Sequence, residues 1–248
     1  MTDGDVPESH PRSESLAVRH RLEAGVERGI THTQGLLAHG RGEAFDYLLG
    51  ERTIESAARA ERSAAAHLLL ADRPVLSVNG NVAALVPEGI VELAAATDAA
   101  IEVNLFNRTD ERLAAIAEHL REHGAHEVLG LDADARLPGL DHERAKVDAA
   151  GIPAADVVLV PLEDGDRAEA LAALGKVEIV VDLNPLSRSA QAADVPVVDD
   201  IVRAIPAVAE HARELAGAPN GELERIIAAF DRERALEAAE RTIRTGDG

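Results

Sequence analysis

The sequence predicts an α/β fold, a Rossmann-like and mostly parallel sheet flanked by helices, and two observations lead to that prediction. Short runs rich in valine and isoleucine recur through the middle of the chain, and most are separated by helical stretches. These runs are apolar at successive positions, which is typical of strands covered on both faces, as in a parallel sheet. The predicted strands are 75–78, 101–105, 127–129, 157–160, 177–181 and 195–198.

Helices are predicted toward both ends of the chain. Residues 1–14 contain Asp, Gly, Pro and Ser without periodic apolar positions, so we expect a flexible tail. Apolar residues at helical spacing predict a helix over 15–28 and a long alanine-rich helix over 54–71. A charged final helix is predicted over 219–245, with an apolar stripe that we expect to pack on its own domain; a dimer contact is the alternative. The stripe consists of Leu223, Ile226, Ile227 and Phe230.

The predicted organisation is therefore a tail (1–14), an N-terminal helical segment (15–73), an α/β core (74–218) and a C-terminal helix (219–248). A chain of 248 residues that is 46% hydrophobic can bury a substantial core. It has no cysteine, which excludes disulfides and thiol catalysis. No apolar run is long enough to span a bilayer and the first residues are polar and acidic, so we expect a cytoplasmic protein without a membrane partner.

The charge of the chain is strongly acidic, with 45 Asp and Glu residues against 25 Lys and Arg residues, a net charge of −20. Among the basic residues only Lys146 and Lys176 are lysines. This composition is typical of halophilic archaea, because molar salt shortens the screening length to about 3 Å and weakens repulsion between carboxylates. Nucleic acid is excluded as an expected partner, since no basic face is visible. A cationic partner is the functional alternative to this explanation of the charge.

Residues 38–50 carry two of the four aromatic side chains of the chain. Gly40 and Gly42 allow unusual backbone dihedrals or a close approach to a ligand, so this stretch could form an anion site. A glycine-bent joint between two helices is the alternative. The polar side chains of the stretch are His39, Arg41, Glu43 and Asp46.

Polar turns follow four of the predicted strands, at 79–81, 104–109, 163–167 and 182–188. In open α/β sheets, ligands bind at the carboxyl ends of the strands, where helix N-termini favour anions. Each turn alone could be a helix cap, but four at one edge predict a site.

Several standard motifs are absent. The chain has no P-loop, no Gly-x-Gly-x-x-Gly after the first strand and no Gly-x-Ser-x-Gly elbow, which excludes the usual nucleotide and hydrolase sites. His119, His123 and His126 have a spacing that could gather a metal, but a solvated helix face explains them adequately. Glu163 and Asp164 could hold Mg²⁺, and helix N-capping by Asp164 or by Asp166 is the alternative.

Arginines close to these segments are candidates for anion recognition, because a guanidinium can bind two phosphate or carboxylate oxygens at once. For each one a surface ion pair is an equal alternative. The candidates are Arg19, Arg41, Arg108 and Arg188.

In their order and spacing, residues 38–50, 77–81, 102–109, 160–167 and 181–188 resemble the archaeal phosphopantothenate synthetase family, and the resemblance covers roughly residues 10–206. It implies a homodimer that joins 4-phosphopantoate to β-alanine with ATP and Mg²⁺ in coenzyme A biosynthesis. The products would be 4'-phosphopantothenate, AMP and diphosphate, formed through an acyl adenylate.

The resemblance also implies roles for particular residues. The ATP-binding positions would be Arg19, Arg41, Asp182, Leu183, Asn184, Arg188, Ser189, Asp200 and Ile201. Contacts to 4-phosphopantoate are expected from Asn79, Gly80, Asn81, Asn104 and Arg108. His39, Arg41 and Glu43 are expected to be catalytic, with His39 and Glu43 as acid–base or orienting groups. The family has Asp-Asn-Ile where this chain has Asp199, Asp200 and Ile201, which puts one amide contact in doubt.

Two other functions remain as alternatives. A phosphohydrolase could use Glu163, Asp164 and Asp166 with Mg²⁺, and it would release phosphate without an amine. A non-catalytic nucleotide-sensing module would bind ATP without turnover.

Overall fold

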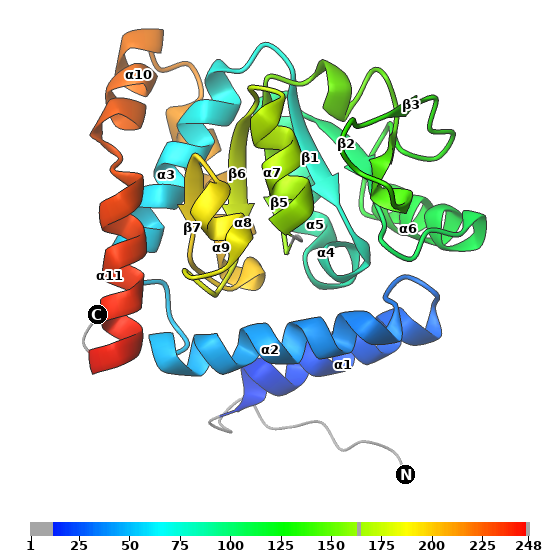
Figure 1. Ribbon diagram of the computed structural model, residues 1–248, viewed down its shortest axis with the longest axis horizontal. Coiled ribbons are helices and arrows are strands. Elements are labelled where there is room, and N and C mark those ends of the chain that lie inside the picture. The colour runs from blue at the N-terminus through cyan, green and yellow to red at the C-terminus, as the bar shows by residue number, and fades with distance from the viewer. Residues whose placement is uncertain (1–11, 163–164, 247–248) are drawn as a thin grey trace.

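The structure is a computed structural model that describes residues 12–162 and 165–246. Its centre is a five-stranded parallel sheet of order β2-β1-β5-β6-β7 (Figure 1). The strands are β1 (Pro74–Val78), β2 (Ala100–Val103), β5 (Val157–Pro161), β6 (Val177–Val181) and β7 (Val195–Val197). The strand order reverses at β1, which lies between β2 and β5. A crevice at such a switch point is the usual ligand site of an open α/β sheet.

Helices precede, connect and follow these strands, as predicted. The helices are α1 (Ser13–Glu27), α2 (Thr33–Leu49), α3 (Glu55–Leu70), α4 (Gly80–Leu85), α5 (Pro87–Thr97), α6 (Asp110–Glu122), α7 (Gly165–Ala173), α8 (Arg188–Ala192), α9 (Ile201–Leu215), α10 (Asn220–Ala229) and α11 (Arg232–Thr245). The segment between α6 and β5 contains an antiparallel pair, β3 (Ala135–Arg136) and β4 (Lys146–Val147), and two short 3₁₀ helices, η1 (Glu143–Ala145) and η2 (Ile152–Ala154). No described helix is long and apolar enough to cross a membrane.

The two faces of the sheet are covered by different layers, α7 on one side and α3, α5 and α9 on the other (Figure 1). Alternate side chains of each strand enter the two layers, as the pleat requires. Val158 of β5 packs with Leu171 of α7, whereas Leu159 joins the core that contains Val208 and Ala209 of α9. Because both faces are buried, the strands read as continuous apolar runs in the sequence.

The long helix α2 runs across the carboxyl ends of the strands (Figure 1). A third hydrophobic cluster holds its end in place: Leu49 packs there with Ile54, with Leu183 after β6 and with Leu236 of α11. The α2 helix therefore covers the edge of the sheet at which the polar turns were predicted.

Three predictions about elements need correction. Residues 127–129 form only an isolated parallel bridge between Leu129 and Glu102, so the strand prediction there is wrong. The final helix is two helices, because Phe230 is extended and Asp231 caps α11 by accepting a hydrogen bond from the Arg234 N–H. Of the predicted tail, Ser13 and Glu14 begin α1, and residues 1–11 lie outside the described residues.

Candidate active site

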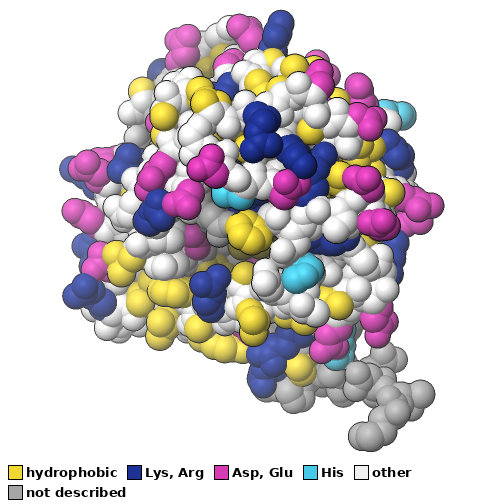
Figure 2. All heavy atoms as spheres, turned by 45° about the vertical axis from the view of Figure 1, so that its right-hand side comes forward, with side chains coloured by type: hydrophobic (Ala, Val, Ile, Leu, Met, Phe, Trp, Pro, Cys, Tyr) yellow, Lys and Arg dark blue, Asp and Glu magenta, His cyan; other side chains and the backbone are white. Residues whose placement is uncertain are grey.

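A cavity of about 770 Å³ lies between α2 and the carboxyl ends of the strands. Its walls are α2, the turn after β1, the loop after β2, η1, the start of α7 and the loop between β6 and α8. On the side of the molecule seen in Figure 2, acidic and basic side chains are interspersed, and hydrophobic side chains gather in its lower part. The cavity brings together the turns that the sequence predicts to meet.

The turn after β1 is fixed by the side chain of Asn79. Its Oδ1 accepts hydrogen bonds from the N–H groups of Asn81 (3.0 Å) and Val82 (3.1 Å), which caps α4. Its Nδ2 donates to the carbonyls of Pro161 (3.1 Å) and Leu162 (3.3 Å) at the end of β5. The ends of two adjacent strands are therefore tied together at the floor of the cavity.

The same turn holds the first part of α2. The Nδ2 of Asn81 donates to the Gly35 carbonyl at 2.9 Å. A Cβ on Gly80 would lie 2.4 Å from the Ile30 carbonyl oxygen, so only glycine allows the chain segment before α2 to pass this close.

Gly40 and Gly42 lie inside α2, so both the predicted unusual dihedrals and the alternative of a joint between two helices are wrong. A Cβ on Gly42 would lie 3.5 Å from the Leu183 Cδ1, an ordinary van der Waals distance, and the close approach of these glycines to a ligand stays a prediction. Small residues recur at helical spacing at Gly35, Ala38 and Gly42, and all three line the cavity. This face of the helix brings its backbone close to the site.

The loop between β6 and α8 forms the wall beside the C-terminal half of α2. Asp182 organises it: Oδ1 accepts from the Asn184 N–H (2.9 Å) and Oδ2 from the Ser187 hydroxyl (2.5 Å). Burial raises the pKa of Asp182, while the bonds from Ser187 and Asn184 and the charge of Arg41 oppose that rise. Because the charge of Arg41 acts on the Asp182 carboxylate, Arg41 of α2 lies close to the loop that Asp182 organises.

Arg188 begins α8 and faces the start of α7. It forms ion pairs with Asp166 (2.6 Å) and Glu169 (2.9 Å), and its side chain is 61% exposed. Exposed pairs of this kind contribute little to stability, so a ligand can exchange for them readily. Leu183, Asn184 and Ser189 also line this end of the cavity.

The other end of the cavity, beside the start of α2, contains two arginines that the sequence analysis missed. Arg112 of α6 donates to the carbonyls of Ile30 (2.7 Å) and Asn107. Arg144 of η1 lies over the ring of Phe106, 5.8 Å from its centre. Thr109 caps the start of α6, and a threonine at this position is a local indication that Arg112 lies in the first turn of a helix. Nothing in the sequence around Arg144 indicates its position.

Two predicted site residues pair with each other. Arg19 of α1 donates to both oxygens of Glu43 of α2 at 2.8 and 2.9 Å. Burial alone would raise the pKa of Glu43, but the hydrogen bonds from Arg19 and Tyr47 outweigh it and hold the pKa below its ordinary value. Neither Arg19 nor Glu43 is among the described residues that line the cavity, whereas His39 is.

Two predicted substrate contacts are used within the protein. The Nδ2 of Asn104 donates to the carbonyls of Arg144 and Lys146, both at 3.1 Å, and Asn104 is buried. Arg108 donates to the Gly130 carbonyl at 2.7 Å. Both side chains position neighbouring loops, and neither is among the described residues that line the cavity.

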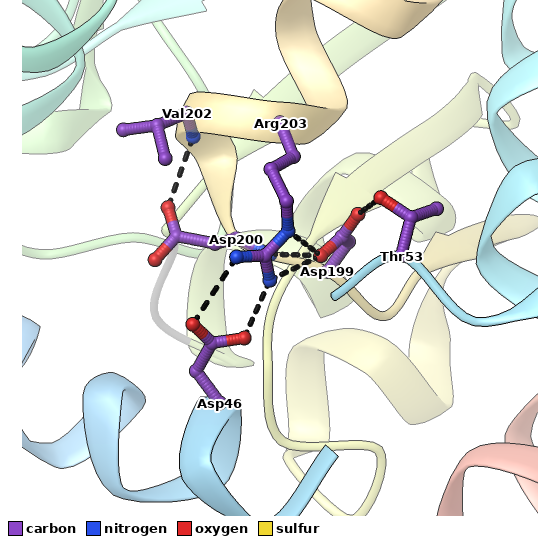
Figure 3. Close-up of polar contacts among 6 residues, drawn as sticks. All are labelled: Asp46, Thr53, Asp199, Asp200, Val202 and Arg203. Atoms are coloured by element: carbon purple, nitrogen blue, oxygen red, sulfur yellow. Dashed lines mark hydrogen bonds and ion pairs between the residues drawn. The ribbon is translucent and has the colours of Figure 1, made fainter. Parts of the chain in front are cut away.

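Asp200 and Ile201, predicted to bind ATP, begin α9. Asp200 caps the helix by accepting from the Val202 N–H at 2.9 Å (Figure 3), and Ile201 is buried in the core. Burial raises the pKa of Asp200, and the Val202 bond opposes that rise. A charge on His39 would also favour the ionised carboxylate, which places this cap near α2.

The predicted metal ligands Glu163 and Asp164 lie outside the described residues. Among residues 12–162 and 165–246, no group of three or more histidine and carboxylate side chains could hold a metal by itself. His119 and His123 contact each other edge to face, and Glu122 and Glu88 lie beside them. These histidines lie on and after α6 and are not among the described residues of the cavity wall.

Comparison with known proteins agrees with the resemblance seen in the sequence. A model of the phosphopantothenate/pantothenate synthetase family matches residues 56–246. The chain is 58% identical over 232 residues to a 4-phosphopantoate–beta-alanine ligase of Thermococcus onnurineus, covering 93% of this chain and 89% of that protein. It is 54% identical over 235 residues to the protein of the same name from Methanosarcina mazei, covering 95% and 92%. The family match covers more than half of the chain, and the chain belongs to the phosphopantothenate/pantothenate synthetase family.

Proposed function

We propose that this protein condenses 4-phosphopantoate with β-alanine at the expense of ATP and forms 4'-phosphopantothenate in coenzyme A biosynthesis. The names of the relatives from Thermococcus and Methanosarcina support the reaction. We propose an acyl adenylate as the intermediate, and ATP is therefore converted to AMP and diphosphate.

One observation carries the proposal: the cavity has arginines at both ends, although the chain as a whole is strongly acidic. Arg41 and Arg188 line one end, and Arg112 and Arg144 line the other. ATP and 4-phosphopantoate are both anions, so a site for the pair needs two separate cationic regions. A cavity of about 770 Å³ has room for two such molecules.

We assign ATP to the end formed by Arg41 and the loop between β6 and α8. Asn184 and Ser189 add polar groups there, and Phe45 and Leu183 add an apolar surface. We assign 4-phosphopantoate to the end with Arg112 and Arg144, next to Asn79, Gly80 and Asn81. The assignment puts the two reacting ends of the substrates near His39, in the middle of α2.

The chemistry follows from this placement. A carboxylate oxygen of 4-phosphopantoate attacks the α-phosphorus of ATP, and the bond to diphosphate breaks. The amine of β-alanine then attacks the acyl carbon, AMP leaves, and one proton is released from nitrogen. In this proposal Arg41 offsets the charge that develops at the α-phosphate, and His39, which lines the cavity, accepts the proton. We propose that Glu43, which accepts hydrogen bonds from Arg19, orients α2.

We propose that Mg²⁺ enters with ATP. This ion keeps several waters and is usually held by one or two carboxylates together with phosphate oxygens. Asp166 and Asp182 are the described carboxylates on the cavity wall, and such a donor set fits the ion. Bound there, Mg²⁺ would offset the charge of the phosphates. Chelation with EDTA should abolish turnover and added Mg²⁺ should restore it; activity that survives chelation would contradict this proposal.

The reaction itself is tested by incubating the protein with Mg²⁺, ATP, 4-phosphopantoate and β-alanine in molar KCl, omitting each substrate in turn. AMP and the condensed product should appear only in the complete mixture. ADP in place of AMP would replace the adenylate by an acyl phosphate. Phosphate released without β-alanine would indicate a phosphohydrolase, and ATP binding without turnover would indicate a sensing module.

Two further properties are proposed with the function. A homodimer would cover part of the outer surface of α2, where Leu37 is 74% and Leu48 is 51% exposed. Size-exclusion chromatography with light scattering decides between a dimer and a monomer. A halophilic, cytoplasmic origin predicts that the thermal midpoint rises as KCl is increased to molar concentration; a midpoint that falls would contradict it.

A further inference from the structure

Four carboxyl groups and one arginine gather between the C-terminal half of α2 and the start of α9. They are Asp46 of α2, Glu61 of α3, Asp199 and Asp200 before α9, and Arg203 of α9. We call these five residues the Arg203 cluster, and Figure 3 shows four of them. None of the five is among the described residues that line the cavity, and apart from the ATP contact expected of Asp200 no role in the reaction has been given to them.

Arg203 joins two segments that are far apart in the sequence. Its Nη2 and Nη1 donate to the two oxygens of Asp46, at 2.5 and 3.2 Å, and its Nε and Nη2 donate to Oδ1 of Asp199, at 2.9 and 2.6 Å (Figure 3). Both carboxylates are buried. A planar fork of donors makes this double contact, and the single ammonium of lysine does not reproduce it.

Asp199 is itself held from several directions. Its Oδ1 also accepts from the Asp200 N–H (2.7 Å), and its Oδ2 accepts from the hydroxyl of Thr53 (2.5 Å). Protonated Glu61 can donate a further hydrogen bond to Asp199, and this neighbour helps to raise the pKa of Glu61. The turn before α9 is therefore a rigid anchor, and Arg203 transmits its position to Asp46.

The charges of the cluster make Arg203 indispensable to this arrangement. Asp46, Asp199 and Asp200 each bring a carboxylate, and Arg203 is the cation between them. Removal of one partner of a buried ion pair leaves an uncompensated charge, which is strongly unfavourable. Without the guanidinium, Asp46 and the Asp199 turn would repel each other, and the part of α2 around Asp46 would shift while Leu49 stays packed.

The location of Asp46 on α2 links the cluster to the site. Asp46 follows Phe45 directly and lies one helical turn beyond Gly42, at the end of the cavity assigned to ATP. The opposite end of α2 is held separately, by the bond from Asn81 to the Gly35 carbonyl. The Arg203 cluster therefore acts on the half of α2 that carries Arg41.

We propose that Arg203 is a positioning residue for the reaction: by holding Asp46 against Asp199, it fixes the C-terminal half of α2 and keeps Arg41 at the ATP end of the cavity. The kinetic consequence of this inference rests on the proposed function. The structural consequence does not, and the two are measured separately.

The test compares Arg203→Lys with Arg213→Lys in the full-length protein. Arg203→Lys keeps the charge among the carboxylates, so the protein should fold, but it removes the fork. Arg213 lies on the same helix and pairs with Glu92 on the surface, where its side chain is 55% exposed, so Arg213→Lys is a matched control. Asp46→Asn cuts the same contact from the other side and decides the question if Arg203→Lys does not fold.

The structural measurement uses Tyr47, the only tyrosine of a chain without tryptophan. It lies next to Asp46, and its hydroxyl donates to Glu43 at 3.0 Å, so its fluorescence reports on this part of α2. Quenching by acrylamide should increase in Arg203→Lys and in Asp46→Asn and stay at the wild-type value in Arg213→Lys. Equal quenching in all four proteins would overturn the proposal.

The kinetic measurement separates the two substrates. In Arg203→Lys the KM for ATP should rise about tenfold, while the KM for 4-phosphopantoate should change less than about threefold. An equal loss for both substrates would assign Arg203 a general structural role and overturn the inference. If wild-type protein forms no product, the proposed function fails, and the Tyr47 measurement still decides whether Arg203 holds α2.

Discussion

Arg19 and Glu43 join the first two helices: the Arg19 Nη2 lies 2.8 and 2.9 Å from the two carboxylate oxygens of Glu43. The Tyr47 hydroxyl donates to the same carboxylate at 3.0 Å. A residue predicted to bind ATP and one predicted to be catalytic are therefore parts of one contact. Their effects on the reaction should be coupled.

A double-mutant cycle tests this coupling. Arg19→Ala and Glu43→Ala should each lower kcat/KM, and the double variant should lose little more than the worse single one, because both changes break the same contact. The measurement is kcat/KM for ATP in all four proteins. If the losses multiply, Arg19 and Glu43 act separately, and Glu43 would regain a direct catalytic role.

Arg41→Ala should lower kcat by about a hundredfold and also raise the KM for ATP, because the cation contacts the phosphates of bound ATP and offsets the charge that develops at the α-phosphate in the transition state. The fold should persist, since Arg41 lies on the cavity wall and α2 remains packed through Leu49. Arg59→Ala, at an exposed pair on α3, is the control. Unchanged kcat in Arg41→Ala would remove this residue from the site.

Glu61 should make the stability of the protein depend on pH. Burial and the neighbouring Asp199 raise the pKa of Glu61 from an ordinary 4.5 to about 8. A raised pKa in the folded state means that the folded protein holds this proton more tightly than the unfolded chain. The resulting stabilisation is complete below pH 4.5 and is lost as the pH rises toward 8.

Glu61→Gln keeps a neutral, hydrogen-bonding side chain at every pH and should remove this contribution. Relative to wild type, the variant should gain up to about 1 kcal/mol in unfolding free energy per pH unit between pH 6 and 8. Urea unfolding across this range measures the difference, and Glu55→Gln, on the exposed first turn of α3, is the control. Parallel curves for wild type and Glu61→Gln would show that Glu61 titrates normally.

Gly40 of α2 and Gly80 of the turn after β1 should respond oppositely to alanine. A Cβ on Gly40, inside α2, would meet no atom within 4 Å, so Gly40→Ala should stabilise the helix by about 1 kcal/mol. Gly80→Ala should destabilise the protein, since its Cβ would lie 2.4 Å from the Ile30 carbonyl oxygen. Thermal midpoints decide both; a neutral Gly80→Ala would mean that the turn after β1 yields easily.

The sequence predicted the sheet well where both faces are buried. The runs at 157–160 and 177–181 coincide with β5 and β6, because continuous burial leaves a continuous apolar pattern. The prediction failed at 127–129, where a similar run makes one bridge to Glu102. Glu102 is itself fully buried in β2, where the N–H groups of Asp148 and Ile152 bind its carboxylate, and no local pattern reveals such distant partners.

For the site, the sequence indicated the edge of the sheet but not which side chains face the cavity. The polar turns at 79–81 and 182–188 do line it, since parallel strands end at one edge. Arg108 was predicted and Arg112 was not, although the two lie only four residues apart. Which of them enters the cavity depends on the packing of α6 against the segment that contains Ile30, a tertiary contact.

Two polar contacts hold opposite ends of α2. At its first turn the side-chain amide of Asn81 donates a hydrogen bond to the Gly35 carbonyl, and near its last turn Arg203 forms an ion pair with Asp46. The two attachments share no residue and belong to opposite halves of the cavity. A substitution at either attachment should therefore loosen one half of α2 while the contacts of the other half persist.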